Sequence, residues 1–260
     1  MGPVELNVDD RGVAWLKLNR PDLHNSMNSA MIAELTLMAG RLGRDPAVRV
    51  VVLTGEGRSF CAGADLGWMK AQMEADAESR AREARALAEM LGALDRLPKP
   101  LIGRIQGQAY GGGIGMMSVC DVAVGVDSAM FGLTEVKLGL IPATIGPYVV
   151  ARMGPARARR VFFSGRRFSA RQAVELGLLA RAVPEADLDT EIEAEIAPYL
   201  GAAPGAVAES KALVATLGGA PDEAQISATI DALIGRWESA EAAEGIGAFF
   251  DKRKPKWADG

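Results

Sequence analysis

Short runs of apolar residues alternate with longer segments of helical periodicity along most of the chain. Uninterrupted apolar runs of this length are typical of strands buried on both faces of a sheet, so the pattern predicts an α/β fold. Acidic and glycine residues between the first two runs predict a hairpin. We interpret the following runs as strands: Val4–Val8, Val13–Leu18, Val48–Leu53, Leu101–Ile105, Asp121–Val126 and Leu179–Val183.

Helical periodicity fills most of the remaining sequence. Met31, Leu35, Met38 and Leu42 fall on one face of a helix that Asn28 or Ser29 can cap. We expect a loop over Gly55–Asp65, which is rich in glycine and alanine. We expect mostly loop over Met130–Pro142 as well. Further helical segments are predicted over Leu66–Leu97, from Gly111 to Cys120 after a glycine turn, over Ile145–Phe163 and over Ala170–Leu178.

The pattern changes toward the end of the chain, where strand-like runs stop. From Glu185 onward every segment is predicted to be helical, with breaks at Gly201–Pro204, Gly218–Pro221 and Lys254–Pro255. We therefore expect a core over residues 1–195 and a helical region over residues 196–260.

Composition narrows the possible partners. The chain has 260 residues, 49% of them apolar, and a net charge of −4, which disfavours general binding to nucleic acid. Pro142, Gly146 and Pro147 interrupt the longest apolar stretches, so none reaches the roughly 20 residues that a membrane helix needs. We expect neither a nucleic-acid nor a membrane partner.

Cysteine and histidine are scarce. Cys61, Cys120 and the single His24 are too few for a disulfide framework or a structural zinc site, so we expect no metal and a reduced compartment. The N-terminus has neither the basic nor the apolar part of a secretory signal, and a cytoplasmic location is predicted. His24 lacks an accompanying G-x-S-x-G elbow, which argues against a hydrolase triad.

Two turns rich in glycine and alanine carry the candidate chemistry. Phe60–Asp65 and Gln106–Gly113 each follow an apolar run and precede a helical pattern. Such turns expose backbone N–H groups, and two of them side by side can hold one anionic oxygen. Tight turns and close helix packing would also explain these glycines. The spacing does not fit the dinucleotide motif G-x-G-x-x-G.

Glu135 is the candidate acid or base. It lies in the stretch Phe131–Glu135, beside apolar residues that would disfavour its charged form and so suit a proton shuttle. A surface glutamate in a loop is the alternative interpretation.

Taken in order, seven segments resemble the enoyl-CoA hydratase/isomerase (crotonase) superfamily over nearly the whole chain. They are Leu18–Pro21, His24–Asn28, Val51–Gly55, Phe60–Leu66, the glycine turn ending at Cys120-Asp121, Phe131–Pro142 and Gly247–Pro255. The resemblance implies an α/β fold: a ββα spiral with two roughly perpendicular sheets and a C-terminal helical trimerisation region. It also implies a homotrimer or a dimer of trimers. The substrate would be an acyl-CoA thioester, with no separate cofactor.

The resemblance also assigns roles to individual positions. Ala64 and Gly112 would donate the two N–H groups to the thioester oxygen, and Glu135 would be the acid/base. Trp68 would line the acyl pocket, although it would serve equally as a core aromatic. The remaining substrate or CoA contacts would come from Asp22, Leu23, His24, Ser26, Ala62, Gly63, Asp65, Leu66, Gly111, Thr134, Pro142, Phe249 and Lys252, the last two in such folds often from a neighbouring subunit.

One position departs from the pattern. Hydratases of this family with two catalytic carboxylates carry the first glutamate at the position of Gly115, which leaves Glu135 alone here. Single-glutamate members include isomerases that move one proton between carbons. A double-bond isomerase therefore remains an alternative, and a decarboxylase or thioesterase is a weaker one. A non-catalytic relative that binds RNA is a further alternative, although Arg80–Arg96 mixes acidic residues with its arginines.

A narrower resemblance favours hydration. The stretches Ala64–Lys70, Gly112–Gly115, Glu135–Ala143 and Ile145–Val150, with His24-Asn25, look like the bacterial methylglutaconyl-CoA hydratase branch, which as we interpret it also has glycine at position 115. Hydration of an α,β-unsaturated acyl-CoA is thus the first expectation. A distal carboxylate on the substrate would need a polar partner, for which Tyr148, Arg152 and Lys70 are the candidates.

Overall fold

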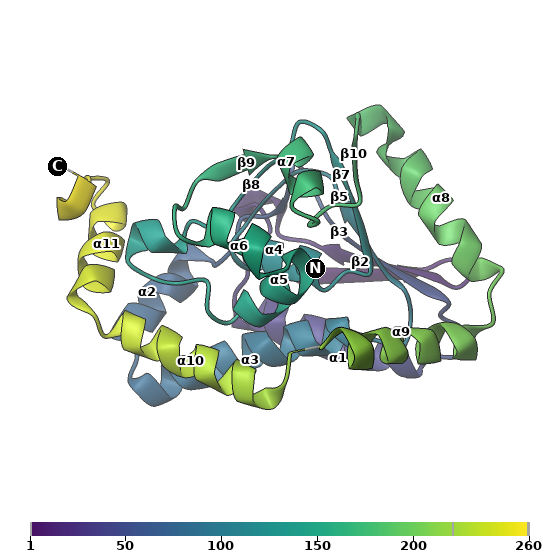
Figure 1. The fold of residues 1–260 in the computed structure, drawn as a ribbon, viewed down its shortest axis with the longest axis horizontal. Coiled ribbons are helices and arrows are strands. Elements are labelled where there is room, and N and C mark those ends of the chain that lie inside the picture. The colour runs from purple at the N-terminus through teal and green to yellow at the C-terminus, as the bar shows by residue number, and fades with distance from the viewer. Residues whose placement is uncertain (1, 220, 259–260) are drawn as a thin grey trace.

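The computed structural model describes residues 2–219 and 221–258. It has two sheets with helices packed around them, and the helices of residues 204–237 run along one side of the molecule (Figure 1). The main hydrophobic core joins the first sheet to α1 (Ser29–Arg44), α3 (Ala77–Asp95) and α4 (Gly112–Ser118).

The first sheet contains six strands in the order β1-β2-β3-β5-β7-β10. Only β1 and β2 pair antiparallel, as the predicted hairpin, and Val4 there lies opposite Leu18. The other neighbours are parallel, and every residue of β3 is buried, in agreement with its continuous apolar run. The strands are β1 (Val4–Val8), β2 (Val13–Leu18), β3 (Val50–Gly55), β5 (Leu101–Ile105), β7 (Val122–Val126) and β10 (Arg181–Val183).

Most of the second sheet occupies segments that the sequence pattern assigned to loops or turns, and residues 167–169 of it fall where no element was predicted. It has four strands in the order β4-β6-β8-β9, and each has only three residues, too few to show an alternating pattern. Strands β4, β6 and β8 each come directly after a strand of the first sheet, which gives the repeated ββα turn of the expected spiral. They are β4 (Ser59–Cys61), β6 (Gln108–Tyr110), β8 (Met130–Gly132) and β9 (Arg167–Ser169).

The helices largely follow the predicted segments. Asn28 caps α1 by accepting a hydrogen bond from the Met31 N–H, as expected from its position. The segment predicted as one helical region from Leu66 divides into two helices, because Asp76 caps a new helix by accepting from the Ser79 N–H. The remaining helices are α2 (Leu66–Glu74), α5 (Gly146–Met153), α6 (Pro155–Phe162), α7 (Ala170–Glu175), α8 (Leu188–Leu200), α9 (Pro204–Gly218), α10 (Glu223–Trp237) and α11 (Ala240–Phe250).

Short 3-10 helices join several of these elements. They are η1 (Pro21–Leu23), η2 (Glu135–Leu138), η3 (Glu185–Asp187) and η4 (Lys256–Ala258). The break predicted at Gly218–Pro221 falls between α9 and α10, and residue 220 within it lies outside the described residues. An additional break at Ser239, the cap of α11, was not predicted.

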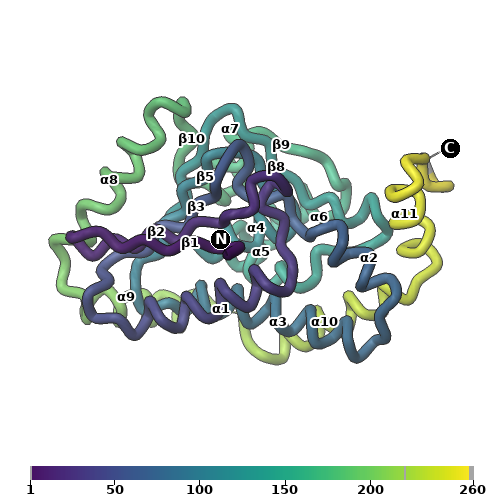
Figure 2. Tube along the Cα trace, turned by 180° about the vertical axis from the view of Figure 1, so that it is seen from behind, coloured from purple at the N-terminus to yellow at the C-terminus, as the bar shows by residue number. Residues whose placement is uncertain are grey.

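The last helices pack back on the core. Ile226 and Ile230 of α10 contact Ala84 and Ala88 of α3, and both views show the two helices side by side (Figures 1 and 2). Helix α8 spans residue 195 and packs on the first sheet. The expected boundary between a core of residues 1–195 and a region of residues 196–260 stays a prediction. No helix in the described part of the chain is long and apolar enough to span a membrane.

Candidate active site

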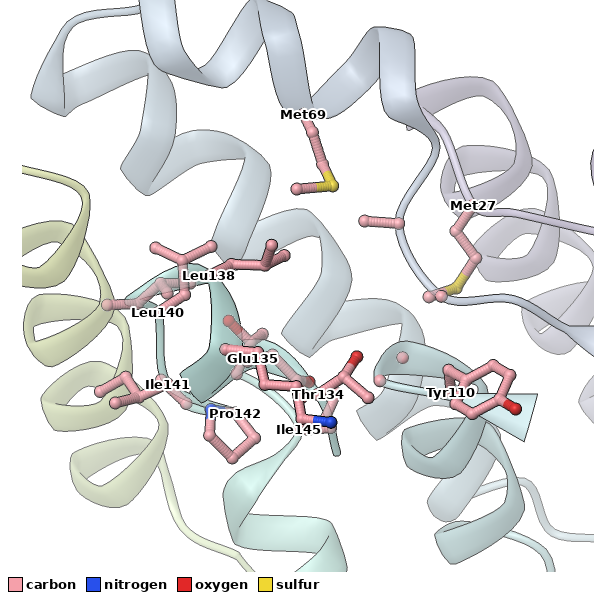
Figure 3. A pocket seen from close by; sticks show the side chains of 18 of the residues that line it. Met27, Met69, Tyr110, Thr134, Glu135, Leu138, Leu140, Ile141, Pro142 and Ile145 are labelled. Carbon is pink, nitrogen blue, oxygen red and sulfur yellow. The ribbon is translucent and has the colours of Figure 1, made fainter. Parts of the chain in front are cut away.

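One cavity of about 450 Å³ collects most of the predicted site residues. It lies between the two glycine turns, η2 and the helices α2, α10 and α11, and most of its lining is apolar (Figure 3). Predicted residues that line it are Ala62, Gly63, Ala64, Leu66, Trp68, Gly111, Gly112, Thr134, Glu135, Pro142 and Phe249.

Ala64 is held in an extended segment that pairs with Met27. The Met27 N–H donates to the Gly63 carbonyl at 2.7 Å, and the Asp65 N–H donates to the Met27 carbonyl at 2.9 Å. In a parallel bridge of this kind the central residue points its own N–H to the opposite side. The Ala64 N–H therefore takes no part in this bridge, and Ala64 lines the cavity.

Asp65 connects this segment to α2 and to Arg20. Its carboxylate accepts hydrogen bonds from the Gly67 and Trp68 N–H groups, which caps α2, and it pairs with Arg20 at 2.9 Å. Burial raises the pKa of Asp65, but the bonds from Trp68 and Arg20 outweigh that effect and hold the pKa below its usual value. Asp65 thus fixes the turn and does not line the cavity.

The second turn ends at Gly111, whose φ of +50° is a conformation suited to glycine. Gly112 is the first residue of α4, so its N–H has no carbonyl of its own helix to meet and carries the positive end of the helix dipole. The two turns touch: a Cβ on Gly63 would lie 3.0 Å from the Tyr110 carbonyl oxygen, and one on Gly113 would lie 2.6 Å from that of Cys61. Small residues therefore let the two turns pack together, with Ala64 and Gly112 both lining one cavity.

Glu135 begins η2, which follows β8 across a two-residue link. Its Oε2 is buried and has no hydrogen-bond partner, while Oε1 would be 3.2 Å from a Cβ placed on Gly111. Figure 3 shows the side chain among those that border the cavity. Burial raises the pKa of this carboxyl to about 7 from an ordinary 4.5, and a hydrogen bond from its own N–H offsets only part of that rise. A group with this pKa can both accept and release a proton near neutral pH.

Gly115 does not line the cavity, because Ile145 occupies the space beside it. A Cβ on Gly115 would lie 2.7 Å from Ile145 Cγ2, closer than real contacts allow, and Ile145 itself lines the cavity. Where a second carboxylate would start, this chain has a packed hydrocarbon side chain.

Several predicted contacts lie outside the cavity. Asp22 and Leu23 are exposed on η1, and Lys252 is exposed just after α11. His24 has a left-handed φ of +52°, and its Nδ1 lies 2.8 Å from Ser59 Oγ. The nearly buried Ser26 hydroxyl faces Asp65 at 3.4 Å.

The candidates proposed for a distal carboxylate are not at the cavity, which corrects that expectation. Tyr148 is buried and donates its hydroxyl to the Ala88 carbonyl, while the Arg152 guanidinium donates to the carbonyls of Cys120, Asp121 and Gly177. Lys70 is exposed on α2. Both tyrosine and arginine had plausible chemistry, but buried carbonyls already use their donors.

Two cations that the sequence pattern did not single out do line the cavity, Lys137 and Arg167. The Arg167 guanidinium lies 5.3 Å from the centre of the Tyr110 ring. Leu233 and Trp237 of α10 and Thr144 also line it and were not predicted. Across residues 2–219 and 221–258, no three His, Cys, Asp or Glu side chains form a group that could hold a metal ion.

Comparison with known proteins finds similar sequences and structures over most of the chain. The sequence profile of the family described as enoyl-CoA hydratase/isomerase matches residues 9–260. The enoyl-CoA hydratase AKT6-1 of Alternaria alternata is 35% identical over 207 residues, which cover 79% of this chain and 67% of that protein. A solved enoyl-CoA hydratase from Shewanella pealeana is 36% identical with a TM-score of 0.80, over 98% of this chain and 96% of that one. Another from Mycobacterium avium is 31% identical with a TM-score of 0.88, over 98% of each chain.

Proposed function

Because this chain belongs to the enoyl-CoA hydratase/isomerase family of enzymes, we propose that it adds water across the α,β double bond of an acyl-CoA thioester, or removes water in reverse. The observation that carries the proposal is the convergence of Ala64, Gly112 and Glu135 on one cavity. Two backbone donors and one buried carboxyl are the groups that this addition needs.

The two N–H groups would hold the thioester oxygen. As water adds to Cβ, negative charge moves onto that oxygen, and donors fixed in advance by the turns stabilise it without reorganising. The backbone of Ala64 is fixed by its pairing with Met27, and Gly112 by the start of α4. Loss of one such donor typically costs about 3 kcal/mol of transition-state stabilisation.

Glu135 would move the proton. Its carboxylate takes one proton from water while the water oxygen bonds to Cβ, and the electron pair of the double bond becomes an enolate held by the N–H pair. Glu135 then returns the proton to Cα, so that the elements of one water molecule are added in total. The raised pKa of Glu135 suits both steps.

Apolar residues would receive the acyl chain. Trp68, Leu66 and Phe249 line the cavity with Pro142. The segment Asp22–Ser26 and Lys252 lie outside the cavity, and we propose that they contact the CoA part of the substrate. The cavity also has Lys137 and Arg167, which support methylglutaconyl-CoA as the candidate substrate, because its distal carboxylate could pair with either cation.

A panel of acyl-CoA thioesters tests this proposal. Hydration of a trans-2-enoyl-CoA removes the absorbance of the conjugated thioester, and we expect that loss with the unaltered enzyme. We expect Glu135→Gln to lower turnover at least about a thousandfold, because no other carboxyl group of the described residues lines the cavity. Hydration at the normal rate by that variant contradicts the mechanism.

The double-bond isomerase remains the second candidate, and the filled space beside Gly115 favours it. An isomerase would use the same Glu135 to move a proton between Cα and Cγ with no water added. Conversion of a 3-enoyl-CoA without any hydrated product would support it over hydration. Binding of CoA thioesters without either reaction would support a non-catalytic relative.

A separate comparison tests methylglutaconyl-CoA as the substrate. We expect the enzyme to turn over methylglutaconyl-CoA faster than crotonyl-CoA, and we expect Arg167→Met or Lys137→Met to remove that difference.

A further inference from the structure

The nucleophilic water needs a second polar partner, and α4 does not supply it. A carboxylate carried by position 115 would have to displace Ile145, because even a Cβ there would lie 2.7 Å from Ile145 Cγ2. A water molecule that touches Glu135 alone is free to rotate about one hydrogen bond, so the orientation of its oxygen toward Cβ would be poorly fixed.

Two buried side-chain atoms among the described residues have no hydrogen-bond partner, and both belong to residues that line the cavity. They are Glu135 Oε2 and Thr144 Oγ1. Thr144 is only 4% exposed. Because buried polar atoms almost always meet a partner, two such atoms on residues of one cavity are suited to bind a polar atom of substrate or water.

The backbone holds Thr144 at a fixed place relative to Glu135. The Leu140 N–H donates to the Glu135 carbonyl at 3.0 Å, which joins η2 to the segment that follows. Within that segment the Ala143 N–H donates to the Ile141 carbonyl at 2.8 Å, and the Gly146 N–H donates to the Ala143 carbonyl at 2.9 Å. Thr144 therefore sits in a hydrogen-bonded turn that leads into α5.

We propose that Thr144 positions the water that Glu135 activates, an inference that rests on the hydration function proposed above. The water donates one hydrogen to Glu135 and the other to Thr144 Oγ1, which leaves an oxygen lone pair for Cβ. Glu135 removes the first proton as the C–O bond forms, and the second stays on the product hydroxyl. Thr144 exchanges no proton itself, so it is a positioning residue.

The test compares Thr144→Val, which keeps the shape and removes the hydroxyl, with Thr144→Ser, which keeps the hydroxyl. For hydration of crotonyl-CoA we expect Thr144→Val to lower kcat by about tenfold to a hundredfold, the usual worth of a hydrogen bond in a polar reaction step, with KM within about threefold. Thr144→Ser should stay within about threefold of the unaltered enzyme.

A second readout separates positioning from damage to the site. Exchange of the Cα hydrogens of butyryl-CoA in D₂O needs Glu135 and the N–H pair but no water addition. We expect Thr144→Val to exchange at nearly the normal rate, and Glu135→Gln to lose exchange and hydration together. Thr190→Val, at an exposed position of α8, is the matched control and should change neither.

The outcomes are distinct. Normal hydration by Thr144→Val overturns the inference and leaves the proposed function standing, as does an equal loss of hydration and exchange. If the Val variant does not fold, Thr144→Ala against Thr144→Ser decides by the same two readouts. An unaltered enzyme that hydrates no enoyl-CoA overturns the proposed function itself.

Discussion

At the scale of single residues, Glu135 shows how burial tunes a carboxyl group. Its Oε2 has neither solvent exposure nor a donor, and its pKa rises to about 7. In the unfolded chain the group has its ordinary pKa of 4.5, so the folded protein binds this proton more tightly. Stability is therefore lost as pH rises from about 4.5 to 7, and the full cost is present above pH 7.

Glu135→Gln should consequently be inactive and more stable at alkaline pH. The amide cannot ionise, so at pH 8 the variant avoids a cost on the order of 3 kcal/mol, while near pH 4 the two proteins should differ little. Urea unfolding at both pH values measures the difference, with the exposed Glu209→Gln as control. A variant less stable than the unaltered protein at pH 8 would contradict the assigned burial.

The same pKa predicts how the reaction depends on pH. Because Glu135 accepts a proton only in its charged form, kcat/KM for hydration should rise with pH through about 7.

Gly115 and Ile145 pack against each other, and the Ile145 side chain fills the volume that a side chain at position 115 would need. Gly115→Ala should cost about 1–3 kcal/mol by overpacking, although alanine favours helices. Ile145→Ala alone should cost about 2–5 kcal/mol by leaving a void.

The double variant should cost less than the sum, with a coupling of about 1–2 kcal/mol in urea unfolding. Gly235→Ala on α10, where a Cβ meets nothing within 4 Å, is the matched control and should stabilise the protein slightly. Additive costs would show that the two positions do not compete for space.

At the scale of elements, prediction from sequence succeeded where a pattern was long enough to carry information. The six strands of the first sheet were found because each coincides with a short, mainly apolar run in the sequence, even though β1 and β10 are only partly buried. Helix α1 was found because its apolar face repeats over several turns. The three-residue strands β4, β6, β8 and β9 were missed, since so short a segment shows no period and pairing alone makes it a strand.

The site was predictable to a similar degree. The positions of Ala64, Gly112 and Glu135 followed from family motifs, and all three line the cavity. No local motif marked Thr144, Lys137 or Arg167 as site residues. They line the cavity because of how the chain folds, which the local sequence pattern does not show. Tyr148 was misassigned for the opposite reason: its chemistry suited the role, but its hydroxyl is buried against Ala88.

The contact between α11 and η2 gives an element-scale prediction. Gly245 lets the helix approach closely, since a Cβ there would lie 2.6 Å from the Leu138 carbonyl, whereas one on Gly247 would meet nothing within 4 Å. Gly245→Ala should push α11 and Phe249 away from the cavity and lower kcat/KM about tenfold or more. Gly247→Ala should stay within about twofold. Equal kinetics for the two variants would mean that the contact does not shape the site.

At the scale of the whole molecule, the end of the chain closes the site that earlier segments build. Leu233 and Trp237 of α10 and Phe249 of α11 line the same cavity as the two glycine turns. Arg236 reinforces this arrangement by donating to the Gly139 carbonyl at 2.9 Å and pairing with Glu241 at 2.7 Å. The helices predicted as an oligomerisation region therefore also contribute walls to the cavity of their own chain.

Helix α9 has no buried residue and carries three exposed apolar side chains, Leu213, Val214 and Leu217, at 58%, 69% and 78% exposure. A trimer or a dimer of trimers, expected from the family resemblance, would bury such a surface. Light scattering after gel filtration should then give the mass of three or six chains. Leu213→Glu with Leu217→Glu should lower that mass, while Leu37→Glu on α1 should not. A monomeric unaltered protein would contradict the expected assembly.

The packing of Ile145 against Gly115 also limits which substitutions the chain can accept at these two positions. An acidic residue cannot replace Gly115 by one substitution without a collision, because even its Cβ would lie 2.7 Å from Ile145 Cγ2. Trimming Ile145 first would leave an empty volume that selection on stability opposes. Each substitution alone is expected to cost stability, so a larger side chain at position 115 is accessible only together with a smaller one at position 145.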